Sequence, residues 1–320
     1  MVYLEQFRFP DEDTEFDWLS PPDGAGGRLV NYDTVGYYAD VYPFRQTTSM
    51  GLMSLDFEPI TILCGGNGSG KSTVLNVIAR KLHADRSALY NNSHQFEAFV
   101  NLCQYTSSET LAGEETFGGH RSLQKYDIAS ITKVITSDDI FNWMQEHRLQ
   151  NDRRMHKSYF VAEEYRNKNK GELPRHLNLE TGYNVTEYKR GLAMRKMSFN
   201  QYMKSSVGKL ERGFSNGETA LMRLSETLEN PGIYILDEPE NSMSCEFQMR
   251  LADMIQYFAR NNRCQFIIAT HSPFLLAMQG AKVYNFDAEP VTVANWWETE
   301  NVRLYFELFE QYRDKFLKTK

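Results

Sequence analysis

The sequence predicts an α/β fold with a mostly parallel sheet, preceded by an antiparallel β region near the N-terminus. An apolar, β-branched run at residues 60–64 ends in a glycine-rich turn, and a helical pattern follows at 74–82. Two more apolar runs, at 233–236 and 264–270, have the composition of buried strands. Helical patterns at 219–228 and 247–261 precede and separate these runs. Strands that alternate with helices are typical of a parallel sheet.

Composition excludes several classes of protein. The chain has 320 residues, of which 41% are hydrophobic and 24% are charged. It contains no run of about 18 apolar residues, so we expect no membrane insertion. The N-terminus lacks a basic region followed by an apolar core, so no signal peptide is expected and the expected location is cytoplasmic. The four cysteines are scattered and form no C-x-x-C pair, so neither a zinc site nor a disulfide scaffold is expected.

The N-terminal part predicts strands joined by a loop. Residues 2–9 alternate between apolar and polar side chains like a strand, and residues 10–35 are rich in Pro, Gly and Asp, which is typical of loops. Residues 50–64 predict two strands interrupted at Glu58-Pro59. Between them lies an aromatic cluster in which one ring could stack on a nucleobase, although such clusters more often pack in a core. Its members are Tyr37, Tyr38, Tyr42 and Phe44.

The junction of the first parallel strand and its helix carries the pattern G-x-x-x-x-G-K-S. Its glycines allow backbone conformations in which consecutive N–H groups point at phosphate, and the helix start adds its positive dipole end. Lys71 can reach the β- and γ-phosphates, and the Ser72 hydroxyl can hold Mg²⁺. The sequence therefore predicts a nucleoside triphosphate site. Its residues are Gly65, Gly66, Asn67, Gly68, Ser69, Gly70, Lys71, Ser72 and Thr73.

The middle of the chain gives weaker patterns. Residues 95–102 predict a strand or a short helix, residues 106–119 a loop, and residues 128–136 a strand. Asp138-Asp139 then predict the cap of a helix at 140–147.

Residues 148–212 differ from the rest in charge. They hold fifteen Lys or Arg against seven acids, with aromatic residues interspersed, whereas the whole chain has a net charge of −7. Two interpretations stay open: a solvated helical insertion, or a surface for nucleic acid or an acidic partner.

Three further sites follow the basic segment. Ser215 and Gly217, in Phe214-Ser-Asn-Gly-Glu218, stand at a predicted helix start, an arrangement that binds anions. A buried-type strand ends in Asp237-Glu238, where Asp237 could hold Mg²⁺ and Glu238 could orient or deprotonate the attacking water. His271 follows the next strand and could contact a γ-phosphate.

The order and spacing of these motifs resemble the ABC-type ATPase heads. The forms Leu-Asp-Glu-Pro-Glu and Ala-Thr-His-Ser-Pro resemble the branch of RecF, SMC and OLD-nuclease heads, and among these the short, standalone bacterial predicted ATPases of the AAA family. The resemblance covers roughly residues 50–90 and 125–315, and implies that residues 1–320 form one head with a basic helical insertion at about 140–210.

The resemblance also implies a mechanism that uses ATP and Mg²⁺. Two heads would pack head-to-tail around two ATP molecules, with Lys71 and Ser72 of one copy facing Ser215 and Gly217 of the other. Glu238 would be the catalytic base and His271 the γ-phosphate sensor, while Asn241-Ser-Met-Ser resembles the loop that crosses between subunits.

Some positions depart from the family pattern. The usual glutamine loop is not evident, and its candidates are Gln104, Gln124 and Asp138/Asp139. The signature has Asn216 where many members have glycine, and Phe214 where leucine is common.

The resemblance favours a homodimeric Mg-dependent ATPase coupled to nucleic-acid maintenance or defence, with nucleic acid or an effector protein as the partner. Two alternatives stay open: the ATP-binding subunit of a membrane transporter, and an ATP-timed regulatory switch for a toxin or effector protein.

Overall fold

The structure is a computed structural model that describes residues 1–21, 27, 42–108, 113–117, 120–124, 127–167, 185–207, 216–228 and 230–317. Its strands are β1 (Leu4–Arg8), β2 (Ser54–Asp56), β3 (Ile60–Cys64), β4 (Gln104–Ser107), β5 (Gly113–Phe117), β6 (His120–Gln124), β7 (Thr132–Thr136), β8 (Gly232–Asp237), β9 (Cys264–Thr270), β10 (Lys282–Asn285) and β11 (Thr292–Val293). Its helices are α1 (Glu12–Leu19), α3 (Gln46–Ser49), α4 (Lys71–Lys81), α5 (Phe96–Leu102), α6 (Ile128–Ile131), α7 (Ser137–Asn167), α8 (Val185–Lys196), α9 (Phe199–Val207), α10 (Asn216–Thr227), α11 (Cys245–Asn261), α12 (Pro273–Leu276), the 3₁₀ helix η1 (Trp296–Glu298), α13 (Glu300–Gln311) and α14 (Arg313–Leu317).

The described residues divide into two compact units, Met1–Ile140 with Leu221–Lys320, and Phe141–Ala220. The boundaries fall inside α7 and α10.

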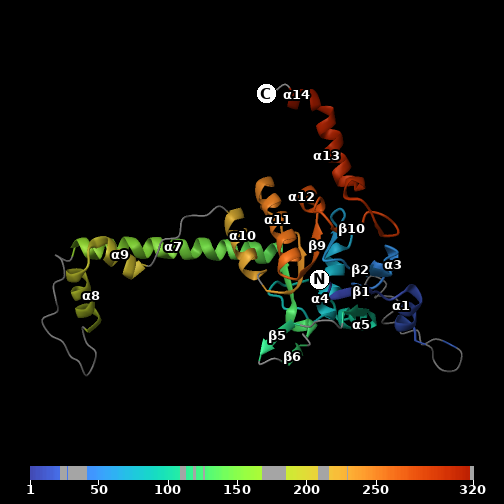
Figure 1. Cartoon of the computed structure of the whole chain (residues 1–320), viewed down its shortest axis with the longest axis horizontal. Coiled ribbons are helices and arrows are strands. Elements are labelled where there is room, and N and C mark those ends of the chain that lie inside the picture. Colours follow the sequence, from blue (N-terminus) through green and yellow to red (C-terminus); the bar gives the residue numbers. More distant parts are fainter. Residues whose placement is uncertain are drawn as a thin grey trace. The chain divides into compact units, whose positions relative to one another are not determined.

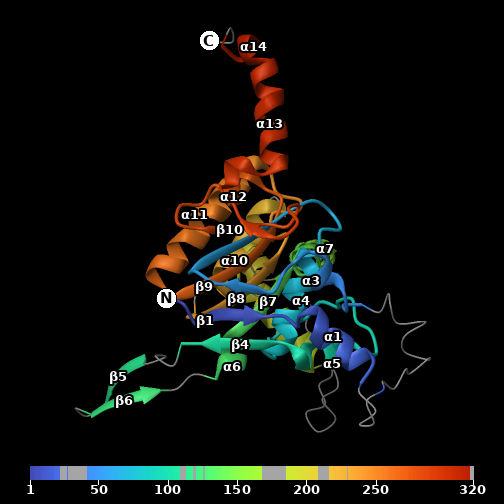
Figure 2. The same ribbon diagram turned by 90° about the vertical axis from the view of Figure 1, so that its right-hand side faces the viewer.

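The first unit is organised around a six-stranded sheet of order β11-β10-β3-β9-β8-β7 (Figures 1 and 2). The pairs from β10 to β7 are all parallel, and only β11 at one edge is antiparallel. Every residue of β3 and β9 is buried, as expected for strands covered on both faces. The predicted mostly parallel α/β fold is therefore confirmed.

A second sheet of order β2-β1-β4 is antiparallel and confirms the predicted N-terminal β region. Gln265, a fully buried residue of β9, connects the two sheets. Its Oε1 accepts hydrogen bonds from the N–H groups of Tyr3 (2.8 Å) and Leu4 (2.9 Å), and its Nε2 donates to the Leu4 carbonyl (2.8 Å). The backbone at the start of β1 thus satisfies the hydrogen-bonding groups of this buried side chain.

Helix α4 begins directly after the glycine-rich turn that follows β3. Gly70 is its N-cap with φ of +90°, a conformation that L side chains rarely adopt. The helix buries Val74, Leu75 and Ile78 in the main hydrophobic core. This packing fixes the start of α4, and hence the turn, against the sheet.

Several expectations outside the central sheet were wrong. Residues 12–19 form α1, capped by the Asp11 side chain on the Thr14 N–H (2.8 Å), where the sequence predicts a loop. The predicted loop at 106–119 contains the end of β4 and the strand β5, which pairs antiparallel with β6. The strand predicted at 128–136 is confirmed for residues 132–136, which form β7 of the central sheet, but residues 128–131 form the helical turn α6. Residues 96–102 are helical, which resolves the choice that the sequence left open.

The second unit is helical where it is described. Tyr165 of α7 packs against Phe199 and Tyr202 of α9, with ring centroids 5.2 and 5.5 Å apart. Among the basic residues of the segment 148–212 whose side chains are described, most are exposed. Those on α7 are spaced so that they point in several directions around the helix instead of along one face. In the described part of the chain, no helix is long and apolar enough to span a membrane.

Candidate nucleotide-binding site

Three parallel strands deliver the predicted residues to one edge of the sheet. The glycine-rich turn follows β3, Glu238 follows β8, and His271 follows β9. The register pairs Cys64 with Thr270 and Asp237 with Ala269, so these strand ends lie level with one another. The sheet thus brings together motifs that are separated by up to about 200 residues in the sequence.

Lys71 folds back over the glycine-rich turn. Its Nζ donates to the carbonyl oxygens of Gly65 and Gly66, both at 2.8 Å, and to Ser69 Oγ at 3.3 Å. Burial lowers the pKa of Lys71, while the nearby carboxylates of Glu238 and Asp287 oppose that shift. The ammonium group is therefore held inside the turn by carbonyl groups, in a position from which it could turn toward a phosphate.

Ser72 and Asp237 approach each other across the sheet edge. Ser72 Oγ donates to Asp237 Oδ1 at 3.1 Å, and burial raises the pKa of Asp237. Mg²⁺ prefers oxygen ligands and commonly uses one or two protein groups, with water and phosphate completing the octahedron. Among the described residues, no group of three or more His, Cys, Asp or Glu side chains could hold a metal ion alone. The pair therefore fits a Mg²⁺ ion that also binds the nucleotide.

Glu238 is fixed from both sides of its carboxylate. His271 Nε2 lies 2.7 Å from Oε1, and Asn241 Nδ2 donates to Oε2 at 2.9 Å. Burial alone would raise the pKa of Glu238, but the hydrogen bonds to Asn241 and His271 and the positive charges of His271 and Lys71 together outweigh burial, so the pKa is lowered. Glu238 also has a positive φ of +48°, which is uncommon for a residue other than glycine. The carboxylate is therefore oriented and kept ionised.

Glu240 contacts the turn that carries His271, and the sequence analysis did not identify it as a site residue. It is only 6% exposed, and its Oε1 accepts from Thr270 Oγ1, from the His271 N–H (3.1 Å) and from the Ser272 N–H (3.3 Å). Among the described residues its buried Oε2 has no hydrogen-bond partner, and burial raises the pKa of the carboxyl. Glu240 thus holds the turn that carries His271. Its position two residues after Glu238 was the available signal.

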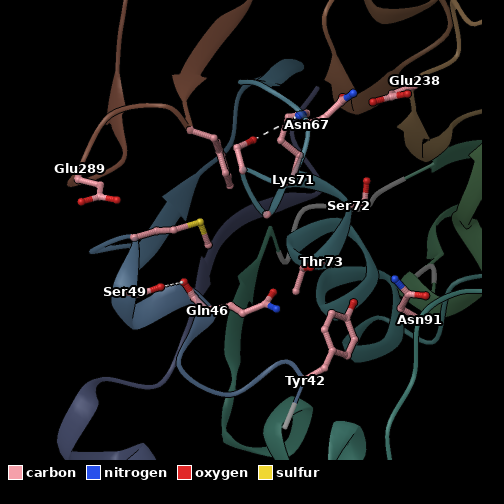
Figure 3. Close-up of a pocket in the computed structure, with 15 residues that line it drawn as sticks. Tyr42, Gln46, Ser49, Asn67, Lys71, Ser72, Thr73, Asn91, Glu238 and Glu289 are labelled. Atoms are coloured by element: carbon pink, nitrogen blue, oxygen red, sulfur yellow. Dashed lines mark hydrogen bonds between the residues drawn. The ribbon is translucent and has the colours of Figure 1, made fainter. Parts of the chain in front are cut away.

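A cavity of about 750 Å³ opens over the glycine-rich turn (Figure 3). Glu238 and Lys71 lie toward one end and Tyr42 toward the other. Tyr42 stacks on Phe96 with ring centroids 5.7 Å apart, as expected for core packing. The same ring also lines the cavity, so the role of stacking on a nucleobase stays open. Phe44 is buried in the core, and Tyr37 and Tyr38 lie outside the described residues. The remaining lining residues are Gln46, Ser49, Met50, Asn67, Gly68, Ser69, Gly70, Ser72, Thr73, Asn91, Phe286 and Glu289.

Asp287 is a second residue that the sequence analysis missed. Its Oδ1 accepts a hydrogen bond from the Gly66 N–H at 2.7 Å. It follows the strand β10, the parallel neighbour of β3, so its position after an apolar run was the available signal. It fixes the first half of the glycine-rich turn from outside the motif.

The other predicted residues come from further parts of the chain. Gly217 lies buried in α10, within the unit Phe141–Ala220, and Ser215 lies outside the described residues. Gln104 begins β4 in the antiparallel sheet, and Gln124 ends β6 in the hairpin, so neither follows a strand of the central sheet.

Among the glutamine-loop candidates, only Asp138/Asp139 follow a strand of the central sheet, since β7 pairs with β8. Asp139 is buried, and its carboxylate accepts from the Thr136 N–H (2.9 Å) and from Ser87 Oγ (2.6 Å). It therefore serves the start of α7, whereas Asp138 is exposed.

Comparison with known families identifies the fold. The family model described as ABC transporter matches residues 52–241, which is more than half of the chain, so the chain belongs to this family of ABC-type P-loop ATPases. A second model, described as an AAA domain of a putative AbiEii toxin of a type IV toxin–antitoxin system, matches residues 211–277. The chain is thus an ATP-binding domain of the ABC type. No curated protein matches it.

Solved structures with similar folds include heads of SMC proteins and ATP-binding cassettes. An Smc head domain with an extended coiled coil, bound to the C-terminal domain of ScpA from Pyrococcus furiosus, is 12% identical; 98% of this chain and 100% of that chain are covered, with a TM-score of 0.39. An Smc head bound to the C-terminal winged-helix domain of ScpA is 14% identical, with 76% and 92% covered and a TM-score of 0.37. A dimeric ATP-binding cassette with ADP and Pi is 14% identical, with 72% and 83% covered and a TM-score of 0.31. At these scores they add no functional argument.

Proposed function

We propose that the chain is a Mg²⁺-dependent ATPase, and that residues 1–320 form one head with a basic helical insertion at about 140–210. The observation that carries this proposal is the Glu238 carboxylate. It is oriented by His271 and Asn241, kept ionised, and lines the same cavity as Lys71. A general base must be deprotonated and held within reach of the water it activates. Glu238 meets the first requirement and lies where it can meet the second.

Each neighbouring residue then has a distinct role. The turn from Gly65 to Thr73 binds the phosphates through its N–H groups, and Lys71 leaves its carbonyl partners to contact the β- and γ-phosphates. Ser72 and Asp237 would hold Mg²⁺. His271 holds Glu238 in position and contacts the γ-phosphate. These side chains bind, orient and move one proton, and the metal supplies charge neutralisation on the phosphates.

We also propose that ATP joins two copies head-to-tail. In this arrangement Ser215 and Gly217 of one copy face the γ-phosphate bound by the other. Membership of the ABC family and the order of the motifs support it. Hydrolysis would release the pair, so that ATP turnover becomes a cycle of association and dissociation in the cytoplasm.

The partner process that we favour is nucleic-acid maintenance or defence. The excess of basic residues in the insertion supports a nucleic-acid partner. The similarity of residues 211–277 to a domain named for a putative toxin also supports the second candidate, an ATP-timed switch for a toxin or effector protein. A transporter subunit is the third, and co-purification with a membrane partner would favour it.

One experiment tests both the ATPase activity and the nucleic-acid partner. The ATPase rate is measured for the protein alone, with DNA and with RNA, each at two salt concentrations. Lys71→Ala is the blank, because it removes the phosphate contact. Mg²⁺-dependent turnover that is absent from the blank supports the ATPase, and turnover equal in both proteins would refute it. Stimulation by nucleic acid that weakens with salt supports phosphate contacts by the basic insertion. A rate indifferent to both nucleic acids would favour the effector switch.

A further inference from the structure

The C-terminal helices α13 and α14 carry an apolar surface that nothing else in the described chain covers. Both views show these helices projecting away from the sheet of their own unit (Figures 1 and 2). Val302 is the only buried residue of the two helices. The proposed ATPase cycle assigns no role to them.

A single stripe runs along both helices. We call it the C-terminal stripe, and its residues are Tyr305, Leu308, Phe309, Tyr312 and Phe316. The spacing of three and four residues places them on one side of a helix. Ring contacts confirm the shared side, with centroids 6.4 Å apart for Tyr305–Phe309 and 5.8 Å for Phe309–Phe316. The side chains are 41–63% exposed.

The opposite side of the helices carries charges, flanked by the exposed apolar residues Phe306 and Leu317. Arg303, Glu307, Glu310 and Asp314 lie there by the same periodicity. A helix with one apolar and one charged side buries its apolar side against a partner. Over residues 300–317 the charges are four acids and three bases, whereas helices that lie on anionic membranes present an excess of Lys and Arg. The charge therefore favours a protein partner over a lipid surface.

Charge is also distributed unevenly along the helices. Residues 300–310 hold three acids and one base, whereas residues 311–317 hold two bases and one acid, and the sequence continues with Lys318 and Lys320. Two copies that run antiparallel bring the acidic part of each helix beside the basic part of the other. The segment is thus complementary to itself in charge and in apolar character.

We propose that the C-terminal stripe pairs with the same stripe of a second copy, antiparallel and without nucleotide. Tyr and Phe side chains bury roughly 150–250 Å² each when fully covered. The five side chains, four of them aromatic, are about half exposed, so the ten in a pair give at most roughly 750–1,250 Å², near the lower limit of specific interfaces. The pairing is accordingly weak alone. It raises the effective concentration of the two heads for ATP-driven closure.

The test is sedimentation of the full-length, nucleotide-free protein between about 1 and 100 μM. The parent protein forms a dimer over this range, and Phe309→Glu weakens the dimer by at least about tenfold. Leu89→Glu is the matched control, because it makes the same change at an apolar residue that is 96% exposed and far from the stripe in sequence, and it leaves the dimer unchanged. Circular dichroism checks that all three proteins are folded.

Cysteine pairs test the direction. Leu304 and Lys315 flank the stripe on the same side, at nearly equal distances from Leu308–Tyr312. Cys245, the exposed one of the four cysteines, is first replaced by Ser. In this background, Leu304→Cys protein mixed with Lys315→Cys protein forms the mixed crosslink in the antiparallel pair. A parallel pair holds the two positions about 16 Å apart along the helix axis and forms no mixed crosslink, which would overturn the antiparallel arrangement.

A monomer at 100 μM, a dimer insensitive to Phe309→Glu, or self-crosslinks alone would overturn the proposal. If the parent protein forms no dimer but binds lipid vesicles, and Phe309→Glu abolishes this binding, the proposal is also overturned and the stripe binds a membrane instead. None of these outcomes bears on ATP hydrolysis or on ATP-driven dimerisation, which are measured with nucleotide.

Discussion

Replacing Glu240 tests whether the turn that carries His271 depends on one buried carboxylate. Glu240→Ala removes the acceptor shared by Thr270 Oγ1 and by the N–H groups of His271 and Ser272. Ser272 keeps one acceptor, since its N–H also donates to Thr270 Oγ1 at 3.0 Å. Two donors therefore lose their partner, namely the Thr270 hydroxyl and the His271 N–H.

The loss of stability in Glu240→Ala can be estimated from these two unsatisfied donors. Leaving a buried donor unsatisfied costs about 1–3 kcal/mol each, and removal of the partly unsatisfied carboxylate offsets part of this. We expect Glu240→Ala to lower the free energy of unfolding by about 2–4 kcal/mol. Glu240→Gln keeps an accepting oxygen in the same place and should cost less than about 1 kcal/mol.

Urea unfolding of the parent protein and both variants measures this difference, and ATPase assays follow its effect on the site. Because His271 also holds Glu238, we expect Glu240→Ala to reduce kcat more than ATP binding, and Glu240→Gln to restore most of the loss. Equal stability of the two variants would refute the assignment of Glu240 as the anchor of this turn.

Three further predictions concern the same site. Burial raises the pKa of Glu240 in the folded protein above that of the unfolded chain, so the folded state retains a proton that the unfolded state has lost. The free energy of unfolding should fall as pH rises from the ordinary glutamate pKa through the folded-state pKa, and urea titrations should show a flatter profile for Glu240→Gln; identical profiles would contradict this. Gly70→Ala forces a Cβ onto a residue at φ of +90° and within 2.8 Å of Met50 Sδ, so we expect a loss of about 1–2 kcal/mol in stability and weaker ATP binding by calorimetry, with normal affinity as the contrary result. Ser72→Ala removes the hydroxyl that contacts Asp237, so activity should require more Mg²⁺, whereas Ser72→Thr should preserve the Mg²⁺ requirement in a metal titration.

The central sheet could be predicted because most of its strands can be recognised from their own residues. The runs that became β3, β8 and β9 are continuous and rich in β-branched residues, as strands buried on both faces must be. The phosphate-binding turn was equally clear, since its glycines and Lys71 stand between a strand and a helix. These features need no knowledge of the distant parts of the chain.

The secondary-structure predictions were wrong where the local sequence pattern is ambiguous or where tertiary contacts determine the structure. Helix α1 is mostly polar and buries only Glu15 and Leu19, so it lacks a strong periodic signal, although Asp11 is a recognisable cap. The turn α6 has an alternating, apolar composition like a strand, and it is stabilised by the Thr132 hydroxyl bonded to the Ile128 carbonyl. Asp11 was the available signal for α1, and Asp127, which caps α6 on the Ala129 N–H, was the available signal for that turn.

Long-range polar contacts were also beyond reach of the sequence. Gln265 stands in an apolar strand because it bonds to residues more than 260 positions away, and Asp287 contacts Gly66 across 221 positions. Such pairings depend on which strands become neighbours in the sheet. The arrangement of Asn241 and Glu240 around Glu238 and His271 depends likewise on β8 and β9 lying side by side.

The most direct test of the account is the ATPase activity and oligomeric state of Glu238→Gln with Mg²⁺ and ATP. The amide is isosteric, its oxygen can still accept from Asn241 Nδ2, and its NH2 can donate to His271 Nε2 in the neutral tautomer that leaves Nε2 unprotonated, so the fold and ATP binding should be retained. Loss of a general base should reduce kcat by about 10²–10⁴-fold, and the ATP-bound dimer should accumulate. Turnover close to that of the parent protein would contradict the assignment of Glu238 as the base, and a variant that binds ATP without forming this dimer would contradict the ATP-joined pair.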